Sequence, residues 1–194
     1  MEAEPIKKLL EEVHSGAMSV EEALVKLRKL PYDDIGFAKI DTHRSLRKGF
    51  PEVIFCKGKT IDQIIQIVQK MHSSGLNIIA TKASPQVHQA IKQILPEAVY
   101  YEEARITAIV PEAPRSLKTV LVITGGTADT PVAEEAAVTA ELVGSRVERL
   151  YDVGIAGLHR LLGNTEKLFS ANVLVAVAGM EGALPSVVGG VVER

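Results

Sequence analysis

The stretch 118-KTVLVITGGTADTPVAEEAAVTAELVG-144 decides the fold. An apolar run rich in β-branched residues, 120–123, stops at residues 124–127 (TGGT), and small and apolar residues then recur at helical spacing from 132 to 142. The pattern predicts a strand, a tight loop and a helix. Two glycines let the backbone turn sharply, and the helix points its free N–H groups at the turn. The loop is therefore suited to bind an anion or a sugar hydroxyl.

Two more strand-and-helix units follow this one. Apolar strands are expected at 147–153 and 173–177, with helices at 156–168 and from about residue 184. Near-continuous apolar strands separated by helices are typical of a parallel sheet covered on both faces, with right-handed crossovers. Ligands of such sheets collect at the carboxyl ends of the strands. The last helix barely begins before the chain ends, so we expect an exposed sheet edge unless another chain or further residues cover it.

The composition narrows the class of protein. With 46% hydrophobic residues the chain can bury a core, and its formal charge of −2, from interspersed charges, argues against nucleic acid as a partner. The N-terminus lacks the pattern of a signal peptide, and no run is long enough to span a membrane. We expect a cytoplasmic protein with no membrane partner. The single cysteine, Cys56, excludes an internal disulfide and a cysteine-based metal cluster, and no dedicated metal-ligand set is visible.

The first half begins with two short helices and continues as alternating strands and helices. Ser19 is the expected N-cap of the second helix, with Glu22 at the capping-box position, and the pair suits packing or subunit contact. A polar segment at 41–49 contains Arg44 and Arg47, which could hold a phosphate or carboxylate or lie in a solvated hairpin turn. The further elements expected are a strand ending at Cys56, a helix at 61–72 capped by Thr60, a strand at 77–81, a helix from Ser84, and an extended segment at 99–110.

A linker is expected between the two halves. Residues 111–116 (PEAPRS) contain two prolines and no apolar pattern, which disfavours both helix and strand. We therefore predict an α/β protein with an N-terminal domain at 1–110, a linker at 111–116 and a partial parallel-sheet domain at 117–194. The first domain combines the helix pair with a smaller α+β unit.

Three segments, in this order, resemble the aminoimidazole ribonucleotide carboxylase (PurE-like) family. They are residues 125–129 (GGTAD), 152–160 (DVGIAGLHR) and 178–185 (AGMEGALP). The resemblance is closer to the LarB branch, because Thr127 and Ala128 replace the serines of the carboxylases proper. A segment of the first half also resembles LarB, through Asp41, Arg44, Arg47, Gly49, Pro51, Glu52, Val53 and Ile54. The fold implied is a three-layer, flavodoxin-like parallel sheet that is C-terminally incomplete and preceded by an added α+β domain.

The activity implied by this resemblance is carboxylation of a pyridinium ring. LarB proteins carboxylate nicotinic acid adenine dinucleotide and hydrolyse its phosphoanhydride, which releases AMP and begins nickel-pincer cofactor biosynthesis. CO2 would be the co-substrate, with no covalently bound cofactor, and the diphosphate makes Mg2+ a candidate ion. The family also implies a homo-oligomer, an octamer in the parent family.

The resemblance gives the candidate residues their roles. Asp129 would accept hydrogen bonds from ribose hydroxyls; the alternative is an ordinary favourable charge in the first turn of a helix. His159 would move the ring proton, unless it is an ordinary surface histidine. Glu181 would act as general base or position the ring carboxylate. The substrate-binding candidates are Gly125, Gly126, Thr127, Ala128, Arg160, Gly179, Met180, Ser186, Arg44 and Arg47.

The carboxylation route that the resemblance implies needs a cysteine nucleophile, located C-terminal to the Leu-Pro segment in the family. This chain lacks that segment, and Cys56 ends an apolar strand, where burial is the expected fate. We therefore expect the 194-residue form to be inactive or severely impaired, whereas a longer parent would be an enzyme. Two alternatives stay open: an aminoimidazole ribonucleotide carboxylase or mutase of purine biosynthesis, and a non-catalytic nucleotide-binding fragment.

Overall fold

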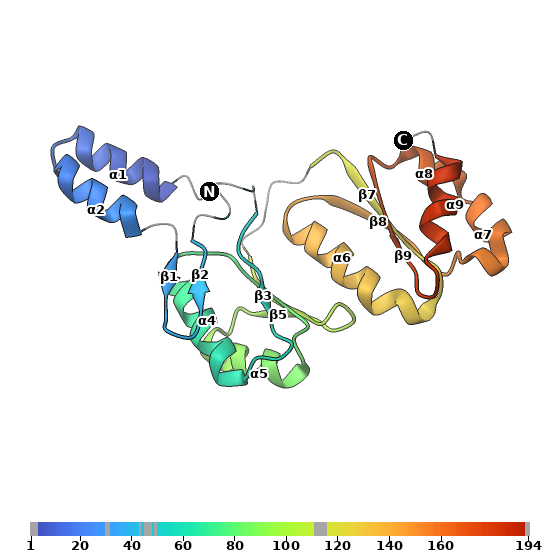
Figure 1. The fold of residues 1–194 in the computed structure, drawn as a ribbon, viewed down its shortest axis with the longest axis horizontal. Helices are drawn as coiled ribbons and strands as arrows, with labels where there is room; N and C mark the ends of the chain where they lie inside the picture. Colours follow the sequence, from blue (N-terminus) through green and yellow to red (C-terminus); the bar gives the residue numbers. More distant parts are fainter. Residues whose placement is uncertain are drawn as a thin grey trace.

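The structure, a computed structural model, describes residues 4–29, 32–42, 44, 48, 50–110 and 116–192. The first half contains α1 (Glu4–His14), α2 (Val20–Lys29), β1 (Asp33–Asp34), β2 (Lys39–Ile40), β3 (Ile54–Phe55), α4 (Ile61–Ser73), β4 (Ile78–Thr81), α5 (Pro85–Ile94), β5 (Val99–Tyr101) and β6 (Ile106–Ile109). The second half contains β7 (Thr119–Thr124), η1 (Thr127–Asp129), α6 (Thr130–Leu142), β8 (Arg146–Leu150), η2 (Ile155–Gly157), α7 (Leu158–Leu162), α8 (Thr165–Ser170), β9 (Val173–Val177) and α9 (Ala183–Val191). Figure 1 shows the arrangement of these elements.

The predicted helix pair is confirmed, and its second helix begins as expected. The Ser19 N–H donates to Glu22 Oε2 (2.9 Å), and the Glu22 N–H donates to Ser19 Oγ (3.1 Å), which is a capping box. Thr60 and Gln63 make the same exchange at the start of α4. In Figure 1 the pair α1 and α2 lies to one side of the sheets.

The first half contains a mixed four-stranded sheet in the order β3-β4-β6-β5. β3 runs parallel to β4, whereas β6 is antiparallel to both of its neighbours. The extended segment expected at 99–110 is a hairpin, and its turn, residues 102–105, contains the charged residues that interrupt the apolar pattern. One face of the sheet is covered by α4 and α5, whose Val68, Met71 and Ile91 are fully buried with Ile78.

The second half contains the predicted parallel sheet, in the order β8-β7-β9. Alternate residues of β7 enter different cores: Val120 and Val122 pack toward α6, and Leu121 and Ile123 pack with residues of α7, α8 and α9 on the opposite face. Both faces of the sheet are thus covered by helices, as the apolar strands predicted (Figure 1). The α/β fold class is confirmed.

The single helix expected at 156–168 is wrong. The segment begins with the short 3-10 turn η2, and two separate helices, α7 and α8, follow. Gly163 caps α7, and the side-chain amide of Asn164 donates to the Arg160 carbonyl oxygen (2.9 Å). A side chain that bonds the preceding turn competes with continuation of the helix, so the chain bends here.

α6 packs against both sheets. Ala133 and Ala137 are fully buried against β7 and its neighbours, whereas Val138 belongs to a cluster with Ile79 and Ile106 of the first sheet. An ion pair between Lys82, which follows β4, and Glu135 joins the same two parts. The helix α6, which follows the loop at residues 125–129, therefore packs against both halves, and this packing fixes its position (Figure 1).

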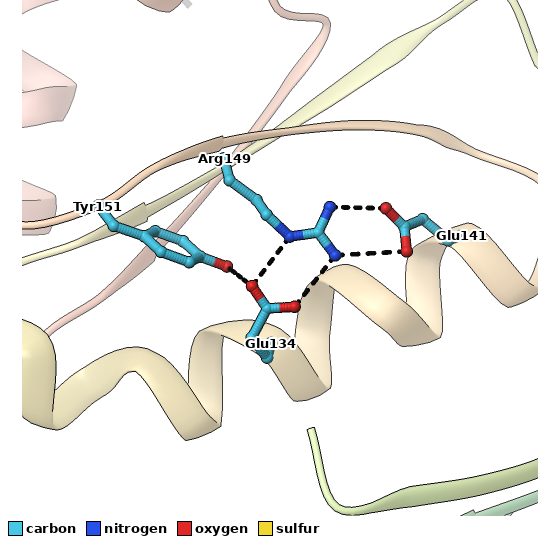
Figure 2. Close-up of polar contacts among 4 residues, drawn as sticks. All are labelled: Glu134, Glu141, Arg149 and Tyr151. Carbon is cyan, nitrogen blue, oxygen red and sulfur yellow. Dashed lines mark hydrogen bonds and ion pairs between the residues drawn. The ribbon is translucent and has the colours of Figure 1, made fainter. Parts of the chain in front are cut away.

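A charged network fixes α6 to β8 (Figure 2). Arg149 donates from Nε to Glu134 Oε1 (2.9 Å), from Nη2 to Glu134 Oε2 (3.0 Å) and from Nη1 to Glu141 Oε1 (2.7 Å). The Tyr151 hydroxyl donates to Glu134 Oε1 (2.7 Å). Burial acts to raise the pKa of Glu134, but hydrogen bonds from Arg149 and Tyr151 and the arginine charge outweigh it, so this pKa lies below its ordinary value.

The expected linker falls mostly on residues 111–115, which lie outside the described residues, so the domain boundary stays a prediction. Among the helices that the structure describes, none is long and apolar enough to cross a membrane.

Replacing Glu134 tests the network. Glu134→Gln is expected to lower the free energy of unfolding by about 1–3 kcal/mol, because Arg149 and Tyr151 lose a charged acceptor in a part-buried place. The measurement is urea unfolding at pH 7. Because the pKa of Glu134 is lowered in the folded state, its contribution is fully present above the pKa of an unfolded glutamate, about 4.3, and is lost as pH falls through the folded value.

The matched control is Glu148→Gln, which breaks a more exposed pair with Arg146 and should cost less than about 1 kcal/mol. Equal losses for the two variants at pH 7 would show that the Glu134 network does not fix α6.

Candidate functional site

Three loops begin side by side at the carboxyl ends of β7, β8 and β9. The Gly125 N–H donates to the Val177 carbonyl oxygen (3.1 Å), which joins the first loop to the third strand. The Val153 N–H donates to the Thr124 carbonyl oxygen (3.0 Å), and the Asp152 N–H donates to Thr124 Oγ1 (3.0 Å). The fully buried Thr124 thus fixes the start of the second loop. These contacts form the edge at which ligands of parallel sheets bind.

Asp129 lies between the first and third loops. Its Oδ2 accepts a hydrogen bond from the Gly126 N–H (2.9 Å) and lies 3.2 Å from where a Cβ on Gly125 would be. Its Oδ1 lies 3.9 Å from the corresponding position on Gly179. Among the described residues no donor bonds Oδ1. One carboxylate oxygen therefore closes the loop, and the other is available to a ligand.

The second loop packs against the first, backbone to backbone. A Cβ on Gly154 would lie 2.4 Å from the Gly125 carbonyl oxygen, so only glycine fits without movement. Arg160 lies over Gly157, whose added Cβ would be 2.7 Å from Arg160 Nε, and its Nη1 donates to Asp152 Oδ2. Asp152 adopts a left-handed conformation, with φ 57°. Arg160, on α7, is thus oriented by Asp152, an acidic residue that follows β8.

Apart from Arg160, the site residues predicted in the second half divide into two groups. Gly125, Gly126 and Asp129 meet at the edge of the sheet, with Gly179 close to the Asp129 carboxylate. The exposed group is Thr127, Ala128, His159, Met180, Glu181 and Ser186. Within the described part of the chain, no hydrogen bond or ion pair joins His159 or Glu181 to Asp129. Both side chains are exposed, His159 on α7 and Glu181 on the loop between β9 and α9.

The arginines predicted in the first half are not part of this edge. Arg44 pairs with Glu52 (3.1 Å), and its guanidinium carbon lies 4.8 Å from the centre of the Phe50 ring. A phosphate would have to compete with that carboxylate. Arg47 lies outside the described residues.

Cys56 is buried, as expected, with 4% of its surface exposed. Burial raises the pKa of its thiol to about 11, against a smaller opposing effect of Lys59. A neutral, inaccessible thiol is a poor nucleophile. Among the described residues no three His, Cys, Asp or Glu side chains form a potential metal site.

Two features of the site were missed from the sequence. The first is the pairing of Asp152 with Arg160, at the two ends of the segment 152–160. Its only sign in the sequence was an acidic residue eight positions before an arginine. The network of Glu134, Arg149 and Tyr151 had a clearer signal. Arg149 interrupts an otherwise apolar strand face, and Glu134 and Glu141 lie two turns apart on one helix face.

Comparisons with known proteins cover both halves. A family model described as the LarB/PurE-like N-terminal domain matches residues 32–111. An uncharacterised protein of Methanocaldococcus jannaschii is 34% identical over 209 residues, which span 97% of this chain and 77% of that protein. The first match covers the mixed sheet of the first half, and the second extends over the three loops.

Substitution of Gly154 tests the packing of the loops. Gly154→Ala is expected to destabilise the fold by about 1–3 kcal/mol, because the new methyl group would overlap the Gly125 carbonyl oxygen. Thermal unfolding followed by circular dichroism measures the effect. Gly189→Ala, in open space on α9, is the control and should be neutral or stabilise by up to about 1 kcal/mol. If Gly154→Ala were as stable as its parent, the two loops would not be in contact.

Proposed function

Because the chain belongs to the LarB/PurE-like family, whose members are carboxylase-type enzymes, we propose that it acts in carboxylation of a pyridine nucleotide. The substrate is nicotinic acid adenine dinucleotide, and the products are a dicarboxylated pyridinium mononucleotide and AMP, as in the first step of nickel-pincer cofactor biosynthesis. The observation that carries the proposal is the junction of three loops at one sheet edge, with Asp129 between the first and third.

The substrate-binding groups at this edge suit a ribose phosphate. Asp129 Oδ1 is a carboxylate oxygen that can accept a hydrogen bond from a ribose hydroxyl. The amino end of α6 favours a negative charge, and the guanidinium of Arg160 can pair with a phosphate or with the substrate carboxylate. The guanidinium of Arg160 would then either leave Asp152 for the ligand or bind Asp152 and the ligand together.

The proposed chemistry needs a nucleophile, a base and CO2. A pyridinium carbon is electron-poor, so a thiolate first adds beside the reacting carbon and gives a dihydropyridine. That carbon forms a bond to CO2, its proton passes to a base, and loss of the thiolate restores the aromatic ring. His159 and Glu181, both exposed, are the candidate bases. Separately, water cleaves the phosphoanhydride and releases AMP.

Cys56 does not fit the role of nucleophile, because its thiol is buried and protonated at neutral pH. The proposal therefore requires a thiolate from another source.

The proposal also includes self-association, since β9 forms an outer edge of its sheet and Val173 on it is half-exposed. A homo-oligomer, octameric as the resemblance implies, would cover such an edge.

Turnover assays test the proposal. The chain is incubated with nicotinic acid adenine dinucleotide and 13C-bicarbonate, with and without an added small alkyl thiol, and mass spectrometry follows labelled mononucleotide and AMP. We expect labelled product with the thiol and little or none without it. Asp129→Asn should reduce product at least about tenfold, because a charged acceptor for the ribose is lost. Carboxylation of aminoimidazole ribonucleotide instead would contradict the proposed substrate.

Replacing Cys56 gives an independent test. Cys56→Ala is expected to leave nucleotide binding and thiol-dependent product formation within about twofold of the parent, because the thiol is inaccessible. Circular dichroism checks that the variant folds. A folded Cys56→Ala variant without activity would make Cys56 the nucleophile and overturn this assignment.

A further inference from the structure

A separate cavity of about 450 Å3 lies in the first half of the chain. It is bounded by the end of β4, the start of α5, β5 and the turn that joins β5 to β6. Its polar lining is Lys82, Ser84, Tyr100, Glu102, Glu103 and Arg105. The volume is in the range of small-molecule sites. None of these residues belongs to the loops that follow β7, β8 and β9.

Arg105 is the cation that this cavity offers to a ligand. Its backbone is held in a left-handed conformation, φ 51°, because its N–H donates to the Glu102 carbonyl oxygen (3.0 Å) and its own carbonyl accepts from the Ala83 N–H (2.8 Å). Within the described part of the chain, its guanidinium has no carboxylate partner. Lys82 differs, since Glu135 already pairs with it. An exposed guanidinium on a fixed backbone is suited to bidentate binding of a phosphate.

The start of α5 adds to the positive potential beside Arg105. Ser84 caps this ten-residue helix by accepting from the Val87 N–H (3.3 Å), and Pro85 follows at its first turn. The amino end of a helix favours an anion through its N–H groups and its dipole. Ser84 and Arg105 both line the cavity, so the helix end and the guanidinium can act on one phosphate.

An aromatic ring forms another wall. Tyr100 stacks on His88, with ring centroids 4.7 Å apart and planes 13° apart, and its hydroxyl donates to the Ala83 carbonyl oxygen (3.2 Å). His88 is held in turn by the fully buried Thr107, whose Oγ1 lies 3.3 Å from His88 Nδ1. A ring fixed in this way can receive a planar heterocycle with little loss of side-chain entropy.

The carboxylates of Glu102 and Glu103 complete the lining. They oppose binding of a bare anion, but they can accept hydrogen bonds from hydroxyl groups. A ligand with a planar base, hydroxyls and a phosphate uses all three kinds of group. We propose that this cavity binds a nucleoside 5′-monophosphate, with the phosphate on Arg105 and the amino end of α5 and the base against Tyr100.

The cavity also lies beside α6, whose amino end belongs to the candidate site. Lys82 on its wall pairs with Glu135, five residues after Thr130 and so about 7.5 Å along the helix axis from the start of α6. The ligand is therefore either a free nucleotide or the AMP half of nicotinic acid adenine dinucleotide. Binding of the AMP half rests on the proposed function.

Calorimetry with AMP and the whole chain tests this inference. Arg105→Asn removes the cation, and asparagine tolerates a left-handed backbone, so the fold should persist. We expect AMP to bind and Arg105→Asn to weaken its binding about tenfold or more. Tyr100→Leu should also weaken it, whereas Lys92→Ala, an exposed cation of α5 outside the lining, should not. No binding of AMP, or equal binding by the parent and a folded Arg105→Asn variant, would overturn the proposal.

Two further titrations separate the sources and the two proposals. If the cavity holds the AMP half, Arg105→Asn weakens binding of both AMP and nicotinic acid adenine dinucleotide; if it holds free nucleotide, only AMP binding falls. Asp129→Asn should weaken binding of the dinucleotide and not binding of AMP, because Asp129 is not among the residues that line the cavity. Arg105-dependent binding of AMP without any carboxylation would leave the cavity assignment intact and count against the proposed function alone.

Discussion

The pairing of Arg149 with Glu134 holds α6 against β8, and the geometry of the candidate site depends on where α6 begins. The carboxylate accepts two hydrogen bonds from the guanidinium and one from Tyr151, so its burial is compensated. On its other side α6 packs through Val138 against the first sheet. Because α6 is held on both sides, its position is fixed. The loop at residues 125–129 leads directly into α6, so its position is fixed as well.

Backbone packing then brings the loops of three strands together. Gly154 contacts the Gly125 carbonyl, Thr124 bonds the backbone of the second loop, and Asp129 lies beside Gly179. Glycine is needed at residue 154 because the two backbones approach there too closely for a Cβ. The proposed function places substrate binding on these packed loops and assigns proton transfer to His159 and Glu181, which are exposed. The family to which the chain belongs supports a carboxylase-type enzyme.

Local patterns were enough to predict most elements of this fold. The apolar strands, the Ser19 and Thr60 caps and the glycine loop each depend on neighbouring residues, and each was found. The break between α7 and α8 was missed because one side-chain bond, from Asn164 to Arg160, decides it. The contact of α6 with the first sheet joins residues distant in the sequence, so no local pattern could specify it. The pairing of α6 with Arg149 left a sign in the sequence, but that sign does not name the partner residues. The sequence predicted the loops that form the candidate site. It did not predict which side chains of these loops contact one another, because that depends on the long-range contacts of α6.

The most direct test of the account is nuclear magnetic resonance of the backbone amides during titration with nicotinic acid adenine dinucleotide. If the loops after β7, β8 and β9 form one site, the amides of Gly126, Gly154 and Gly179 should shift together with a single dissociation constant. Shifts confined to one loop, or different constants for the three amides, would contradict it.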